Sequence, residues 1–456
     1  MTMLSRRRLV FAGLPATMLL PGSPRSPRAT RAAALDHDAA AGIISQHGVD
    51  PMLGINPATG TIFLTWIEPA AMADHAAATP GAEDHAEATP AAEDHMAMPP
   101  SGQAMVTRST DGGQTFGAPV AASGEDPDVI SYVGSSPLVF AGPDGDVYIA
   151  YGRNVAHEGV SFGRDTIRLA RSTDDGVTFA PAVEVFTDSD VLEAGSFQDV
   201  IAAPDGALYT AWLSYRQYMP ENEIDVDDAF TQVRITRSDD AGLTFGPSIL
   251  VDDRSCECCR TSMTVGPDGA LYLAWRDQAP QDDGGDPVRN MVISRSQDSG
   301  QNWTSPTLIH DDGWRFAQCP ESGPVIAADG DGTIHAAWFT GKEDGPGVYY
   351  AASTDGGATF SDPQTLATDD YFPHANVRGF LADDGIFWVT WDDPRTEAGA
   401  IALAGIDAEG TVTPVDTADL TGRTPDVVPT PAGPLLTWLT DDGIQVAIVG
   451  HDEGAA

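Results

Sequence analysis

The stretch Cys256–Pro306 reads CECCRTSMTVGPDGALYLAWRDQAPQDDGGDPVRNMVISRSQDSGQNWTSP and decides the fold of this chain. Its middle part predicts two short strands joined by a tight turn, because the alternating residues Leu271 and Leu273 follow Gly269, which permits positive φ. The last part predicts a third strand, a turn and a fourth strand. Together these pieces form one four-stranded antiparallel unit. Similar units recur along the chain, and such recurrence indicates a repeat architecture.

The hairpin that begins this unit occurs seven times, and each copy ends in an aromatic residue. These residues are Trp66, Tyr151, Trp212, Trp275, Trp338, Trp391 and Trp438. Five copies are followed by a third strand and the pattern S-x-D-x-G-x-T/N-F/W. Its aspartates are Asp111, Asp174, Asp240, Asp298 and Asp355. We expect each aspartate to bond backbone groups of its own turn, which makes the pattern a marker of fold rather than of catalysis.

The amino-acid composition indicates the kind of secondary structure and excludes one class of binding partner. The 456 residues include 42% hydrophobic residues, 47 glycines and 34 prolines, which favours many turns over long helices. The formal charge is −43, and Lys342 is the single lysine. Nucleic acid is therefore excluded as a partner, because phosphate binding needs a basic surface.

The first part of the chain, residues 1–34, is expected to be an export signal. Arg6, Arg7 and Arg8 precede the apolar run LVFAGLPATMLL, which is too short to span a bilayer. The adjacent arginines resemble the twin-arginine signal. We therefore expect an exported, soluble protein (periplasmic, cell-surface or extracellular) without a transmembrane segment, in a compartment that permits disulfides.

A low-complexity insertion at 69–103 separates the second and third strands of the first unit. Its composition cannot build a core, and its period of ten residues places a histidine after each of three aspartates. One interpretation is a solvated loop. The other is metal capture, for which imidazole and thioether ligands suit copper. The candidate ligands in this loop are His75, His85, His95, Met96 and Met98.

The S-x-D-x-G-x-T/N-F/W pattern resembles the Asp box of the sialidase-like (BNR repeat) β-propellers, and the resemblance covers nearly all of residues 35–456. It implies an all-β propeller, for which seven hairpins predict seven blades. The alternative is the six-bladed propeller of catalytic sialidases. The seventh unit lacks a fourth strand, and we expect the segment AAAGIISQHGV before the first hairpin to supply it.

Propeller topology predicts that the starts of the first strands share one face with the loops between second and third strands. Cys256, Cys258 and Cys259 precede the fourth hairpin, and Cys319 occupies the equivalent place before the fifth. Two disulfides, Cys256–Cys259 and Cys258–Cys319, are one expectation. The other is a thiolate metal site for copper or zinc, completed by His374 or His47 on the same face. The CxCC motif and the later Cys-Pro-x-x-Gly-Pro motif also resemble a subgroup of bacterial sialidase-like proteins.

The resemblance also raises the possibility of exo-α-sialidase activity. Such catalysis requires arginines that bind a carboxylate, together with a nucleophile and an acid. The Phe/Tyr-Arg-Ile-Pro motif of true sialidases has no counterpart at Val49–Met52, where no arginine occurs. Candidates for a substitute site are the arginines Arg260, Arg378 and Arg423 and the acids Asp199, Glu257 and Glu321.

Three functions therefore remain open. The first is binding of a soft metal, with copper favoured, or of a small ligand on the cysteine-bearing face. The second is a glycoside hydrolase of sialidase type. The third is a non-catalytic protein-binding or glycan-binding module stabilised by disulfides. In each case we expect a monomer.

Overall fold

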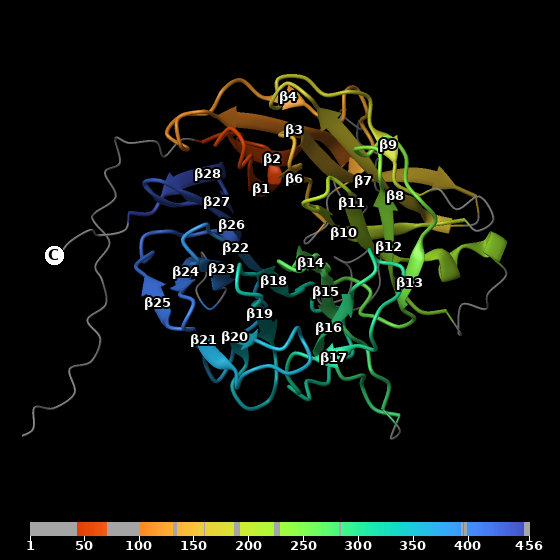
Figure 1. Ribbon diagram of the computed structural model, residues 1–456, viewed down its shortest axis with the longest axis vertical. Helices are drawn as coiled ribbons and strands as arrows, with labels where there is room; N and C mark the ends of the chain where they lie inside the picture. The colour runs from red at the N-terminus through yellow and green to blue at the C-terminus, as the bar shows by residue number, and fades with distance from the viewer. Residues whose placement is uncertain are drawn as a thin grey trace, which may run out of the picture.

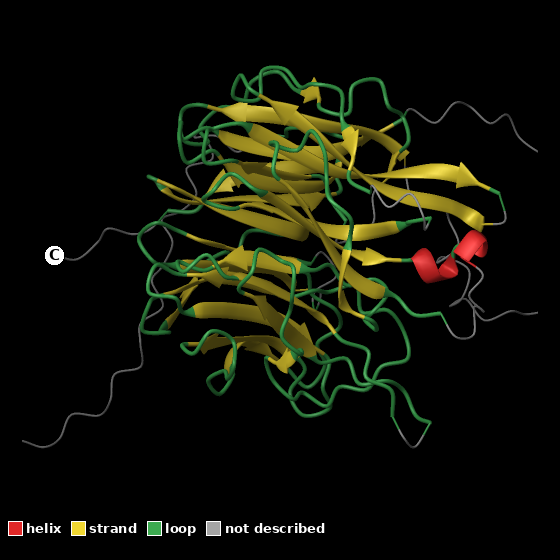
Figure 2. Ribbon diagram, turned by 45° about the vertical axis from the view of Figure 1, so that its right-hand side comes forward, coloured by secondary structure: helices red, strands yellow, loops and turns green. Residues whose placement is uncertain are grey.

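The structure, a computed structural model, describes residues 43–70, 101–130, 135–158, 160–186, 192–222, 229–281, 284–393, 395 and 399–450. The expected export signal lies outside these ranges, as does most of the insertion. Within the described part of the chain no helix is long and apolar enough to cross a membrane. The described helices are two short 3-10 turns, η2 (Arg216–Tyr218) and η3 (Pro220–Asn222), which project from one side of the sheets (Figure 2).

All seven predicted hairpins are present as antiparallel strand pairs. Their first strands are β1 (Val49–Ile55), β6 (Leu138–Ala141), β10 (Gly195–Ala202), β14 (Ser262–Val265), β18 (Val325–Ala328), β22 (Val377–Leu381) and β26 (Arg423–Thr430). Their second strands are β2 (Ile62–Pro69), β7 (Val147–His157), β11 (Leu208–Ser214), β15 (Leu271–Arg276), β19 (Ile334–Thr340), β23 (Phe387–Asp393) and β27 (Gly433–Thr440).

Each hairpin is extended outward by further antiparallel strands. The third strands are β3 (Ser101–Ser109), β8 (Val160–Ser172), β12 (Gln232–Ser238), β16 (Met291–Ser296), β20 (Gly347–Ser353), β24 (Ala400–Ile406) and β28 (Gly443–Ile448). The fourth strands are β4 (Val120–Ala121), β9 (Val183–Glu184), β13 (Ile249–Asp252), β17 (Thr307–Leu308), β21 (Gln364–Thr368) and β25 (Val412–Val415). The short β5 (Val129–Ile130) pairs with both β3 and β7 and so joins the first two hairpins into one nine-stranded sheet.

The sheets are arranged as a ring. Figure 1 shows the first strands around the centre and the fourth strands at the periphery. Each first strand contacts the first strand of the next hairpin, and β26 contacts β1, so the ring closes. Apart from the nine-stranded sheet, there are four four-stranded sheets and the three-stranded sheet of β26, β27 and β28 among the described strands. This arrangement is a β-propeller.

The N-terminal segment lies along the last strand of the chain, as predicted. The Ile44 N–H donates to the Ile444 carbonyl at 3.0 Å, and the Ile444 N–H donates to the Ser45 carbonyl at 2.8 Å. The Ser45 hydroxyl also donates to Glu68 at 2.7 Å. The open edge of β28 is thus partly covered by the start of the described chain.

Buried tryptophans and the aspartate turns stabilise the individual sheets. Trp66, Trp212, Trp275 and Trp338 are almost fully buried, and each indole N–H donates to a carboxylate. In all five aspartate turns the carboxylate accepts the backbone N–H of the residue four positions later. The five aspartate–N–H distances are 2.8 to 2.9 Å. These turns join third strands to fourth strands, and their hydrogen bonds lie within the turn itself, in agreement with a role in folding.

Candidate functional site

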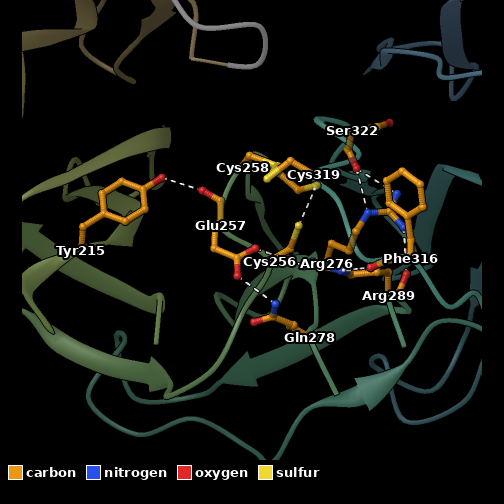
Figure 3. Close-up of a disulfide and its surroundings, with 11 residues drawn as sticks. Tyr215, Cys256, Glu257, Cys258, Arg276, Gln278, Arg289, Phe316, Cys319 and Ser322 are labelled. Atoms are coloured by element: carbon orange, nitrogen blue, oxygen red, sulfur yellow. Dashed lines mark hydrogen bonds and ion pairs between the residues drawn. A yellow bond between two sulfur atoms is a disulfide. The ribbon is translucent and has the colours of Figure 1, made fainter. Parts of the chain in front are cut away.

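The four cysteines converge beside the starts of the neighbouring strands β14 and β18 (Figure 3). Cys258 and Cys319 form a disulfide with Cα atoms 6.0 Å apart, which confirms the predicted contact across 61 residues of sequence. Cys256 and Cys259 are free and buried, and their Sγ atoms are 3.2 Å apart. The Sγ atoms of Cys256, Cys258 and Cys259 all lie within 4.8 Å of one another. A dithiol and a disulfide therefore occupy one small region.

Two buried arginines hold the backbone around this region (Figure 3). Arg276 donates to the Ser322 carbonyl at 2.9 and 3.0 Å and to the Phe339 carbonyl at 2.8 Å. Arg289 pairs with Glu257 at 3.2 Å. Because buried guanidinium groups need partners, these contacts fix the loop that carries the cysteines to the next sheet.

The two free thiols differ in acidity. Burial raises the pKa of Cys256 well above its usual value, and the neighbouring Cys259 adds to this effect. Burial also opposes ionisation of Cys259. The hydrogen bond from Cys256 and the positive charge of Arg276 outweigh it and lower the pKa of Cys259 to about 7. Near neutral pH the pair therefore favours a Cys259 thiolate that accepts a hydrogen bond from the Cys256 thiol.

An aromatic cavity of about 660 Å³ opens beside the disulfide. Cys319 itself lines it, and the rest comes from the end of β19 and from the loops that precede β18, join β19 to β20 and precede β22. The aromatic lining residues are Trp314, Phe316, Phe339, Tyr371 and Phe372. The ionisable lining residues are Glu321, Lys342, Glu343, Asp370 and His374.

The aromatic rings that line this cavity pack against one another. Trp314 stacks on Phe316 with centroids 5.1 Å apart and meets Phe339 edge-on at 5.7 Å. Arg276 places its guanidinium 5.0 Å from the Trp314 ring, which links the cavity wall to the cysteine region. Tyr371 is different because it is 75% exposed and so stands at the rim.

A second cavity, of about 200 Å³, lies at the centre of the ring and is lined by residues from all seven first strands and by Arg260. Its charged residues are Asp199, Arg260, Arg378 and Asp426. Asp199 accepts the Met263 N–H at 2.6 Å, and Asp426 accepts the Leu53 N–H at 2.8 Å. These two carboxylates therefore tie first strands of adjacent sheets together.

The acids at this centre are harder to ionise than usual. Burial raises the pKa of Asp50 to about 7, although Arg378 and Arg423 oppose the shift. Burial likewise raises the pKa of Asp199 to about 6, although the hydrogen bond from the Met263 N–H and the charge of Arg260 oppose the shift. Burial also raises the pKa of Asp426. Burial therefore favours the protonated form of Asp50 up to about pH 7 and that of Asp199 up to about pH 6.

The residues suggested for sialidase catalysis are divided among three places. Arg260, Arg378 and Asp199 line the central cavity. Arg423 has a side chain 60% exposed, 3.8 Å from Asp441, and does not line that cavity. The two glutamates lie elsewhere. Glu257 pairs with Arg289 next to the cysteines, and Glu321 lines the aromatic cavity.

The suggested metal ligands are likewise divided. His374 lines the aromatic cavity together with Cys319, whereas His47 is exposed and lies beside the N-terminal closure. Among the residues that the structure describes, Cys256, Cys258 and Cys259 are the one group of three ligand-type side chains within 4.8 Å. The insertion ligands lie outside the described residues, namely His75, His85, His95, Met96 and Met98.

No protein-family model and no curated protein sequence matches the chain. Among solved structures, an ulvan lyase of polysaccharide lyase family PL25, bound to -[GlcA(1-4)Rha3S]-, superposes with a TM-score of 0.54. It shares 10% sequence identity, over 90% of this chain and 95% of that one. The two chains share a fold. A Hadza microbial sialidase has a TM-score of 0.48 and 14% identity, over 78% of this chain and 74% of its own. The intramolecular trans-sialidase from Ruminococcus gnavus has a TM-score of 0.48 and 12% identity, over 77% and 91% respectively.

The aromatic cavity was not predicted from the sequence. Its rings come from segments without periodicity, GWRF at 313–316 and DYFPH at 370–374, and a further ring ends β19. The available signal was the clustering of aromatic residues in the segments that precede two first strands, on the face that also carries the cysteines.

Proposed function

We propose that this chain is an exported, sialidase-like propeller of seven blades that binds a saccharide in the aromatic cavity. The seven hairpins and the closed ring of first strands support the count, with β5 bridging the first two blades and the N-terminal segment completing the last. The disulfide is compatible with an oxidising, extracytoplasmic compartment.

The observation that carries this proposal is the aromatic cavity itself. Its volume of about 660 Å³ lies in the range of small-molecule sites, and aromatic walls with a few polar groups are their usual lining. The apolar faces of a sugar ring can pack on aromatic side chains, while Glu321, Lys342 and His374 can bond its hydroxyl groups. The fold relative that was solved with a bound glycan makes saccharides the first class of ligand to test.

The central cavity supports a sialidase reaction less well. Arg260 and Arg378 line it, but the exposed side chain of Arg423 does not complete a cluster of three. Asp199 and Asp426 already accept backbone N–H groups and share the space with the two arginines. A substrate carboxylate would have to compete with Asp199 and Asp426 for the two arginines. The cavity therefore favours saccharide binding without sialidase turnover.

Removing the aromatic ring at the rim should weaken saccharide binding about fivefold. Tyr371→Ala deletes a 75% exposed ring, so the fold should be unaffected while a stacking contact of about 1 kcal/mol is lost. Titration calorimetry with sialyllactose and with an oligosaccharide of GlcA(1-4)Rha3S units would measure the effect. Leu250→Ala removes an exposed apolar side chain (44%) on β13 and serves as the control. Equal affinities for the two variants would contradict the proposal.

A second candidate function is binding of a soft metal ion, copper(I) or zinc, by Cys256 and Cys259. Two buried sulfur atoms 3.2 Å apart favour it, because thiolates are the preferred ligands of such ions. Arg276 lies close enough to lower the pKa of Cys259 and would offset part of the negative charge of a thiolate site. The histidines and methionines of the insertion would then serve as further capture ligands.

Copper(I) titration against a competing chelator should give one ion per chain. The Cys256→Ser, Cys259→Ser double variant should lose at least a hundredfold in affinity, because both thiolates disappear. His374→Ala separates two forms of the site. An unchanged affinity would show that the dithiol alone binds the ion, and a tenfold loss of affinity would show that the His374 imidazole is also a ligand. Wild-type stoichiometry in the double variant would exclude the cysteines as ligands.

A further inference from the structure

The dithiol and the disulfide are positioned to react with each other. The three sulfur atoms of Cys256, Cys258 and Cys259 lie within 4.8 Å of one another, and Cys258 is already bonded to Cys319. The free cysteines and Cys319 differ in exposure to solvent. Cys256 and Cys259 are no more than 1% exposed, whereas Cys319 is exposed and lines the aromatic cavity.

We propose that these cysteines carry out intramolecular thiol–disulfide exchange, in which the buried pair Cys256 and Cys259 reduces the Cys258–Cys319 disulfide and releases the Cys319 thiol into the aromatic cavity. Exchange needs a thiolate close to a disulfide sulfur, and the cluster places two thiols in that position. The inference does not depend on saccharide or metal binding.

Local geometry decides which thiol attacks first. Cys258 and Cys259 are adjacent in sequence, so their Cα atoms are about 3.8 Å apart. Disulfides require Cα separations of about 4.4 to 6.8 Å, which makes a bond between these neighbours strained. Cys256 is separated from Cys258 by one residue and does not have this restriction. It is therefore the first nucleophile, as the thiolate that forms when its proton passes to solvent, and the Sγ of Cys259 lies 3.2 Å away, in position for the second step.

The exchange then proceeds in two steps. In the first, the Cys256 thiolate attacks Sγ of Cys258, so a 256–258 bond forms, the 258–319 bond breaks, and Cys319 leaves as a thiolate that takes a proton from water in the cavity. In the second, the Cys259 thiolate attacks Sγ of Cys256, so a 256–259 bond forms and Cys258 leaves as a thiolate. Cys258 recovers the proton that Cys259 released to solvent. One disulfide and two thiols remain throughout, so no external oxidant or reductant is consumed.

The physical consequence is a change in the aromatic cavity and in the covalent link between sheets. Before exchange, a crosslink joins the loops that precede β14 and β18. After exchange, the bridge lies within the short segment 256–259, and the cavity presents a free thiol next to Glu321 and His374. A thiol there can exchange with a disulfide compound, forming a mixed disulfide and releasing that compound's thiol, or it can bind a soft metal ion, neither of which the intact disulfide permits.

Trapping the released thiol tests the proposal. The starting material is full-length protein with one disulfide per chain; protein isolated with two disulfides is first treated with a stoichiometric amount of a phosphine. The folded protein is then incubated with N-ethylmaleimide and a chelator at pH 8. Peptide mapping then follows each cysteine over time. We expect adducts on Cys319 and Cys258 together with a new Cys256–Cys259 disulfide. In the Cys256→Ser, Cys259→Ser variant, labelling of Cys319 should be at least tenfold slower.

The single variant Cys259→Ser distinguishes the two steps. It should still release Cys319 but stop at a Cys256–Cys258 disulfide, because the second nucleophile is missing. The wild-type result stands without any variant, so a misfolded variant does not remove the test. Wild-type protein labelled only on Cys256 and Cys259, or not labelled at all, would overturn the proposal. Equal labelling of Cys319 in the wild type and the double-serine variant would overturn it as well.

Discussion

Replacing Cys258 and Cys319 together by serine is expected to lower the free energy of unfolding by about 4 kcal/mol. The disulfide closes a loop with a sequence separation of 61 residues, which contains β14, β15, β16 and β17. A crosslink of that span removes much of the conformational freedom of the unfolded chain. Urea unfolding of the variant and the wild type, followed by tryptophan fluorescence, would measure the difference.

The control for this prediction removes a buried sulfur without removing the crosslink. Cys256→Ser keeps the Cys258–Cys319 bond and should cost about 1 kcal/mol, the order expected for one altered buried contact. Wild-type protein in strong reductant should approach the stability of the double variant. Equal stability of the crosslinked and uncrosslinked proteins would show that the loop is held by its arginine contacts instead.

The sequence predicted the fold well because its signals are local. Each hairpin combines a turn and alternating apolar residues, and the aspartate turns depend on contacts within four residues, as in Asp298 with Asn302. The N-terminal closure at Ile444 was also predictable, because a missing strand leaves an edge that another segment must cover. The extra strand β5 was not predicted, since a two-residue strand between two sheets has no periodic signal.

The functional site was only partly predictable because it depends on side-chain direction. Equivalent places in successive units brought Cys258 to Cys319, but no local pattern decided that Cys256 and Cys259 remain thiols. In strand register, Asp426 opposite Thr437 is the counterpart of Arg378 opposite Thr390, whereas Arg423 lies three residues earlier, opposite Leu439. The side chain of Arg423 is 60% exposed, next to a bulge where Thr424 has φ 49°. Such a bulge changes the direction of a side chain, and the amino-acid sequence gives no signal for it.

Between about pH 4 and pH 7 the stability of the wild-type protein should fall because of Asp50. The pKa of this carboxyl group is raised from 3.8 to about 7 in the folded chain, mainly by burial. A raised pKa stabilises the fold fully below the unfolded value, and this stabilisation is lost as the pH rises through the folded value. The loss is about 1.4 kcal/mol per pH unit at most, or about 4 kcal/mol in all. Asp199, with a pKa of about 6, acts in the same direction.

Asp50→Asn isolates this contribution, because asparagine keeps the shape of the side chain and tolerates the φ of 52° at this position. Relative to wild type, the variant should become progressively more stable from pH 4.5 to pH 8 in urea unfolding at constant ionic strength. Subtracting the two curves removes the general effect of the large negative charge. Asp111→Asn is the control, because hydrogen bonds from Thr115 and Ser109 lower the pKa of Asp111 to about 2. That carboxyl group is ionised in both folded and unfolded chains across this window, so its variant should differ from wild type by a constant amount. Parallel curves for Asp50→Asn and wild type would mean that Asp50 remains ionised beside Arg378 in the folded protein.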